Sequence, residues 1–78
     1  MKHVTIYSKP GCAACWQTRK LLAQRGVDMT EIDITTNPEA EQHVRDKAGG
    51  AGRVEMPLVE VDSEHWWWGF RLDRIRGL

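Results

Sequence analysis

The fold is decided by residues 6–15, IYSKPGCAAC, in which a strand ends, a turn follows and a helix begins. Residues 2–7 alternate strand-forming side chains, which predicts a strand. The Ser-Lys-Pro-Gly that follows breaks it, because Gly and Pro interrupt regular structure. Residues 12–25 contain no Gly or Pro and repeat their apolar side chains at helical spacing, which predicts a helix ending before Gly26. The two cysteines of the chain therefore lie where a strand gives way to a helix.

The same signals predict the rest of the architecture. We expect a strand at 27–34, a helix from Asn37 to Gly49-Gly50, a loop over 49–52, strands at 58–61 and 65–68, and a helix at 71–77. A strand, a helix and a strand in succession form a parallel pair through a right-handed crossover, and the two late strands form a hairpin. The sequence thus predicts one α/β domain over residues 1–78, a four-stranded mixed sheet with three helices in the order β-α-β-α-β-β-α.

Size and charge exclude several classes of protein. The chain has 78 residues, with eleven basic and eleven acidic side chains. Nucleic-acid-binding proteins usually carry a basic excess, so we expect no nucleic-acid partner. The apolar runs are too short to cross a membrane, and the N-terminus lacks the apolar stretch of a secretory signal. We therefore expect a cytoplasmic monomer.

Cys12 and Cys15 are the candidate catalytic residues. A disulfide between them closes a very small loop and removes chain entropy worth only about 2 kcal/mol, so it is a poor structural staple. A zinc site usually needs four ligands in paired spacings, and the three histidines are scattered. A C-x-x-C within a βαβ pattern is typical of a redox pair. A structural bridge, a metal site and a chance pair of buried cysteines remain the alternatives; we expect no bound metal and no cofactor beyond the redox-active disulfide.

The predicted helix gives the two cysteines different roles. Cys12 lies at or just before the first helical turn, where free N–H groups and the helix dipole favour a thiolate. Lys9, three residues earlier, adds a cation that stabilises the same thiolate. Cys15 shares a helix face with Leu22 and points toward the core. We expect Cys12 to be the nucleophile and Cys15 the buried thiol that resolves a mixed disulfide.

Met56-Pro57 is the second signal. A Pro that begins a late strand is compatible with a cis peptide bond. If the dipeptide packs beside Cys12, the backbone of Met56 is free to pair with an extended substrate chain. The alternative is a trans Pro that merely starts the strand.

The chain resembles the glutaredoxin branch of the thioredoxin superfamily along nearly its whole length. The resemblance rests on residues 6–15, on Met56-Pro57 and on residues 67–73, WWGFRLD, which are similar to the W-S-G-F-R-P-D ending of NrdH-type redoxins. It implies a thioredoxin/glutaredoxin fold. NrdH-type redoxins take electrons from NADPH through thioredoxin reductase and pass them to class I ribonucleotide reductase, so the resemblance also implies these partners.

Departures from the family pattern bear on the electron donor. Glutaredoxins hold glutathione, which carries two carboxylates, through cations, the backbone at the cis-Pro and a Gly-Gly-x-x-Asp segment. The resemblance implies that Lys9, Met56 and Asp73 are the counterparts of these groups here. Glu55 stands where glutaredoxins usually carry Thr and would repel a carboxylate. Trp68 replaces a small residue and would crowd the groove. Leu72 also replaces a Pro, and the two residues between the cysteines are alanines. We expect a flavoprotein reductase as the electron donor. The alternative donor is glutathione, which would make the chain a glutathione-dependent glutaredoxin.

Consecutive aromatics at 66–68 must alternate faces of a strand. We expect Trp67 on one face and its two neighbours on the other, and we expect Trp16 on the outer flank of the site. Both Trp16 and Trp68 are candidates for packing or for an interface. The candidate partner- or glutathione-binding residues are Trp16, Trp68, Gly69, Phe70, Arg71 and Asp73.

Two hypotheses of other classes stay open at this point. One is a metal- or iron–sulfur-binding module, dimerised through Cys12. The other is a non-catalytic interaction domain with a thioredoxin fold.

Overall fold

A computed structural model describes residues 3–50 and 54–78. Four strands form one sheet in the order β2-β1-β3-β4. They are β1 (His3–Ser8), β2 (Asp28–Asp33), β3 (Leu58–Glu60) and β4 (Trp66–Trp68). β1 pairs with β2 in parallel, whereas β3 is antiparallel to both of its neighbours. The predicted mixed sheet and element order are confirmed.

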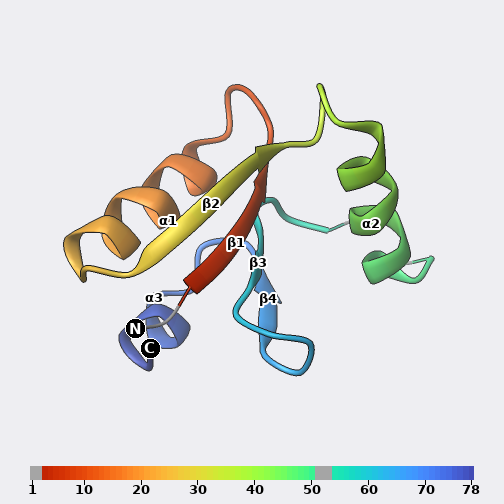
Figure 1. Cartoon of the computed structure of the whole chain (residues 1–78). Helices are drawn as coiled ribbons and strands as arrows, with labels where there is room; N and C mark the ends of the chain where they lie inside the picture. Colours follow the sequence, from red (N-terminus) through yellow and green to blue (C-terminus); the bar gives the residue numbers. More distant parts are fainter. Residues whose placement is uncertain (1–2, 51–53) are drawn as a thin grey trace.

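Three helices cover the two faces of this sheet (Figure 1). They are α1 (Ala13–Gln24), α2 (Pro38–Ala48) and α3 (Leu72–Arg76). α1 and α3 lie on one side of the sheet and α2 lies on the other. The connection from β1 to β2 runs through α1, as a parallel pair requires.

The predicted boundaries differ from the observed ones by one or two residues, as is usual at element ends. Some residues predicted as strand but lying just outside the observed strands still make ladder hydrogen bonds. The Ile34 N–H donates to the Ser8 carbonyl at 2.9 Å, and the Val61 N–H donates to the His65 carbonyl at 2.9 Å. The predicted start of the first strand at Lys2 and the end of the loop at 51–52 fall outside the described residues.

Local chemistry explains where α2 begins and ends. The Asn37 side chain accepts a hydrogen bond from the Ala40 N–H at 3.1 Å, and Pro38 takes the first helical position. Both are favoured at a helix start. The helix stops at Gly49, whose φ of 61° is left-handed and suits a residue without a Cβ.

The main core lies between the sheet and the α1–α3 side. Its fully or nearly buried members are Val4, Ile6, Leu22, Val59, Trp67 and Ile75. Trp67 is only 5% exposed, whereas Trp66 and Trp68 share the opposite face in edge-to-face contact, with ring centroids 6.3 Å apart. The predicted alternation of the three tryptophans is confirmed. The buried Trp67 indole N–H has no acceptor among the described residues.

The α2 side of the sheet is partly polar, which the sequence did not predict. Glu60 lies 2.9 Å from His43 Nε2 and 3.3 Å from Lys47 Nζ. The Lys47 ammonium also lies over the Trp66 ring, 4.6 Å from its centroid, and Tyr7 stacks on His43. Partial burial alone raises the pKa of Glu60, but hydrogen bonds from His43 and Lys47, together with their charges, lower that pKa below its ordinary value.

Candidate active site

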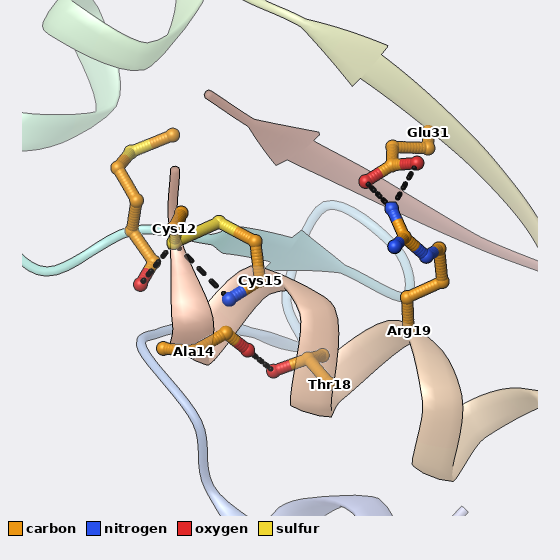
Figure 2. Close-up of a disulfide and its surroundings, with 7 residues drawn as sticks. Cys12, Ala14, Cys15, Thr18, Arg19 and Glu31 are labelled. Atoms are coloured by element: carbon orange, nitrogen blue, oxygen red, sulfur yellow. Dashed lines mark hydrogen bonds and ion pairs between the residues drawn. A yellow bond between two sulfur atoms is a disulfide. The ribbon is translucent and has the colours of Figure 1, made fainter. Parts of the chain in front are cut away.

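Cys12 and Cys15 are joined by a disulfide at the N-terminus of α1 (Figure 2). Cys12 caps the helix: its backbone is extended, with φ −96° and ψ 104°, and its Sγ accepts a hydrogen bond from the Cys15 N–H at 3.1 Å. A sulfur in this position faces the free N–H groups and the positive end of the helix dipole. No acidic residue lies in the first turn to oppose that field. The helix begins at Ala13, one residue later than the predicted range, because Cys12 is the cap.

The two sulfurs differ in their access to solvent. Cys12 is partly exposed, whereas Cys15 is only 3% exposed and lies with Thr18 and Leu22 on the buried face of α1. The Thr18 hydroxyl is also buried and donates to the Ala14 carbonyl at 2.7 Å (Figure 2). This bond ties a side chain beneath the cysteines to the first turn of the helix. The sequence analysis did not predict this bond.

Met56 brings a second segment against Cys12. The Met56 carbonyl oxygen lies 3.8 Å from Cys12 Sγ, and the peptide bond between Met56 and Pro57 is cis. Pro57 is buried. The sequence allowed both a cis and a trans bond here, and the structure has the cis bond beside the cysteine pair.

Gly69 is hydrogen-bonded to the Met56-Pro57 segment. Its N–H donates to the Pro57 carbonyl at 2.8 Å, and its φ of 79° is left-handed. A Cβ at Gly69 would lie 3.1 Å from Oε2 of Glu55, so the Glu55 side chain stands directly against this glycine. The connection from β4 to α3 is thus fixed beside the segment that carries Met56.

Two shallow hollows flank Cys12, and Lys9 lines both. One also contains Trp16 together with Arg19 and Glu31, whose side chains are bonded at 2.8 Å (Figure 2). The other contains Glu55 and Met56. An accessible sulfur, a buried partner sulfur and a neighbouring cation together form a site that can exchange disulfides.

Comparison with known proteins agrees with this geometry. A family model described as glutaredoxin matches residues 4–66. The chain belongs to the glutaredoxin family. Members of this family are thiol–disulfide oxidoreductases, and so is this chain.

Individual relatives point to one branch of the family. The glutaredoxin-like protein NrdH of Escherichia coli (strain K12) is 32% identical over 75 residues, which cover 96% of this chain and 86% of NrdH. The gene 56 protein of Mycobacterium phage L5 is 29% identical over 72 residues, 92% of this chain and 67% of that protein. Among solved structures, the Escherichia coli NrdH-redoxin superposes with a TM-score of 0.84 at 32% identity, covering 97% of this chain and 93% of that one.

An exposed apolar patch adjoins this glutaredoxin site. Its members are Trp16, which is 51% exposed, and Phe70, which is 37% exposed. Trp16 and Phe70 line one further hollow on the outer side of α1, where the Lys20 ammonium lies 4.8 Å from the centroid of the Trp16 ring. Trp16 therefore packs little against the core and is available to a partner, while also bordering the hollow at Cys12.

Other predicted binding residues lie apart or are already engaged. Trp68 packs against Trp66 on the α2 face and is not among the residues lining the two hollows at Cys12. Arg71 donates to both carboxylate oxygens of Asp73, at 3.1 and 2.9 Å. These hydrogen bonds, and the charge of Arg71, hold the pKa of the exposed Asp73 below its usual value.

Within residues 3–50 and 54–78, no group of three or more His, Cys, Asp or Glu side chains is arranged to hold a metal ion. No helix in that part of the chain is long and apolar enough to cross a membrane.

Proposed function

We propose that this glutaredoxin-family chain is a dithiol reductase of protein disulfides, with Cys12 as nucleophile and Cys15 as resolving thiol. The observation that carries the proposal is the unequal placement of the two sulfurs. Cys12 caps α1 and is reachable, whereas Cys15 is 3% exposed. An incoming disulfide can meet only the first of them.

The exchange proceeds in two balanced steps. The Cys12 thiolate attacks one sulfur of the substrate disulfide, a Cys12–substrate bond forms, and the other substrate sulfur leaves as a thiolate that takes up a proton. Cys15 then loses its proton and attacks the Cys12 sulfur, which forms the Cys12–Cys15 disulfide and releases the second substrate thiol. Counted from the dithiol state, in which Cys12 first gives its proton to solvent, the chain loses two electrons and two protons and the substrate gains the same number.

Lys9 and the Met56 segment assist the first step. Lys9 lines both hollows at Cys12, so its charge favours the thiolate that attacks. The Met56 carbonyl, 3.8 Å from Cys12 Sγ, is placed for an extended substrate chain to lie alongside the cis Met56-Pro57 segment.

The proposed electron donor is a thioredoxin reductase, which passes electrons from NADPH. The Escherichia coli NrdH-redoxin that this chain resembles is described as having a thioredoxin-like activity profile. The exposed Trp16 and Phe70, which line one hollow next to the site, support docking of a protein donor. Asp73, a counterpart of a glutathione-gripping residue, is already bonded to Arg71.

The proposed acceptor is a disulfide-containing protein such as a class I ribonucleotide reductase, by similarity to NrdH-type redoxins. We place the reaction in the cytoplasm, where low-potential reductases keep thiols reduced. No resident metal or organic cofactor is needed, because the cysteine pair itself carries the electrons.

A paired assay tests the proposal. NADPH consumption is measured on one protein disulfide, with thioredoxin reductase in one arm and with glutathione plus glutathione reductase in the other. We expect turnover in the first arm and little in the second. Turnover confined to the glutathione arm would identify a glutathione-dependent glutaredoxin, and no turnover in either arm would support a non-catalytic domain.

A further inference from the structure

We propose that Glu55 is a specificity-determining residue, which makes Cys12 react faster with a disulfide flanked by a basic side chain than with one flanked by a carboxylate. This inference rests on the proposed dithiol function and specifies the substrate class for the same site. It starts from the hollow beside Cys12 that is lined by Lys9, Glu55 and Met56.

The charge of this hollow changes when Cys12 ionises. Among residues 3–50 and 54–78, the ionisable side chains that line it, apart from Cys12, are Lys9 and Glu55. In the reacting state the negative charge of the thiolate offsets the positive charge of Lys9. The carboxylate of Glu55 then remains, so these three side chains together present a net negative charge to the substrate that approaches the thiolate.

The position of the Glu55 carboxylate is set by its neighbours. Its Oε2 lies 3.1 Å from the point that a Cβ on Gly69 would occupy. Gly69 is itself held by its hydrogen bond to the Pro57 carbonyl, at 2.8 Å. The acidic group therefore stands at the wall formed by the segment that carries Met56, and a substrate chain lying along that segment passes beside it.

The size of the effect follows from the exposure of Glu55. Exposed charge pairs change equilibria and rates by only about 1.5- to 5-fold. They are also screened by salt, with a Debye length of about 10 Å at 0.1 M. The preference is consequently modest, reverses with the sign of the substrate charge, and declines as salt is added.

The test uses the pre-reduced full chain without any reductase, so it does not depend on the identity of the electron donor. The substrates are short peptide disulfides in which glycines surround each cysteine except at one adjacent position. That position holds lysine, glutamine or glutamate, and it is placed either before or after the cysteine. The rate of protein oxidation is measured for each peptide in a single turnover, and divided by the rate with which dithiothreitol reduces the same peptide. This division removes the intrinsic reactivity of the peptide.

For the wild-type chain we expect the lysine peptide to exceed the glutamate peptide by about two- to twenty-five-fold at low salt, as the combined effect of two such charge changes. Glu55→Gln should bring this ratio close to one, Glu55→Lys should invert it, and salt should reduce it in the wild type. Glu64→Gln, a change of the same kind in the exposed turn before β4, should leave the ratio as it is. A ratio that persists in Glu55→Gln would overturn the proposal. A reduced wild-type chain that reacts with none of the peptides faster than dithiothreitol would instead overturn the dithiol function itself, and this inference with it.

Discussion

Cys12 Sγ lies 3.8 Å from the carbonyl oxygen of Met56, although 44 positions separate the two residues in the chain. The pairing of β1 with β3 accounts for this closeness, because Cys12 follows β1 and Met56 precedes β3. The antiparallel register brings the end of one strand to the start of the other. The proposed nucleophile and the proposed substrate-binding backbone are therefore positioned by the same sheet.

Replacing each cysteine separately should reveal the order of attack. Cys15→Ser leaves the accessible nucleophile in place but removes the resolving thiol, so we expect a stable mixed disulfide between Cys12 and the protein substrate. Cys12→Ser should abolish both capture and turnover. Non-reducing electrophoresis and intact-mass measurement follow the adduct. Capture by Cys12→Ser together with none by Cys15→Ser would show that the roles are reversed.

The charge of Lys9 should favour ionisation of the Cys12 thiol. Removing its charge in Lys9→Gln is expected to move thiolate formation, followed by ultraviolet absorbance of the reduced chain, to higher pH. The rate of reaction with a neutral small disulfide should fall in the same pH range. Lys20→Gln removes a matched charge that lies over Trp16 instead, and should leave the titration unchanged. Equal shifts in both variants would mean that Lys9 has no particular role.

Trp16 should matter for protein partners and not for the chemistry. It is 51% exposed beside the site, so Trp16→Ser removes contact area for a docking protein without opening the core. We expect kcat/KM with thioredoxin reductase to fall about ten-fold or more, mainly through KM, as is typical of an interface tryptophan.

The small disulfide is the internal control for Trp16→Ser, because its rate with the reduced variant should match that of the wild type. Phe70→Ser, which alters the same hollow, should behave similarly. If the variants also reacted more slowly with the small disulfide, the substitution would have disturbed the cysteine pair, and the result would argue against a docking role.

Much of the fold follows from local sequence. The strand and helix order, the Asn37-Pro38 start of α2 and the alternation of the three tryptophans depend on neighbouring residues, and all were predicted correctly. The capping position of Cys12 and the burial of Cys15 also follow from helix geometry alone. Boundaries shifted by a residue or two because end residues can pair in a ladder without completing a strand.

The parts that could not be predicted depend on contacts between distant residues. Glu55 meets Gly69, and Arg19 meets Glu31, only because separate elements pack together. Each of these residues, taken singly in the sequence, resembles any solvated side chain. Trp68 is a further example. Its face of the sheet was predicted, but its contact with Trp66, away from the two hollows at Cys12, was not.

Glu60 should contribute to stability in a way that depends on pH. Its pKa is lowered in the folded chain through His43 and Lys47, against the opposing effect of partial burial. A carboxyl with a lowered folded-state pKa adds stability that is fully present above its unfolded pKa, near 4.3, and is lost as the pH falls through the folded value. Glu60→Gln should therefore lower the free energy of unfolding by about 1 kcal/mol at neutral pH. On acidification the variant should lose less of its remaining stability than the wild type.

Urea unfolding of Glu60→Gln at neutral and at acidic pH measures this difference. Glu64→Gln provides the control, since its side chain is exposed in a turn and should alter neither value. An equal loss of stability by wild type and Glu60→Gln between the two pH values would contradict the role assigned to the pair with His43 and Lys47.

Gly69, in the connection from β4 to α3, should tolerate a side chain poorly. Its φ of 79° is left-handed, and a non-glycine residue there costs about 1–2 kcal/mol. The added Cβ would also meet Glu55 Oε2 at 3.1 Å, but a flexible carboxylate can move aside, so the backbone conformation dominates the loss. Gly77→Ala is the matched control, because Gly77 has a φ of −80° and its nearest contact to a new Cβ is 3.4 Å. Thermal unfolding should show a clear decrease for Gly69→Ala and little change for Gly77→Ala; equal effects would mean that the turn at Gly69 adapts to a side chain.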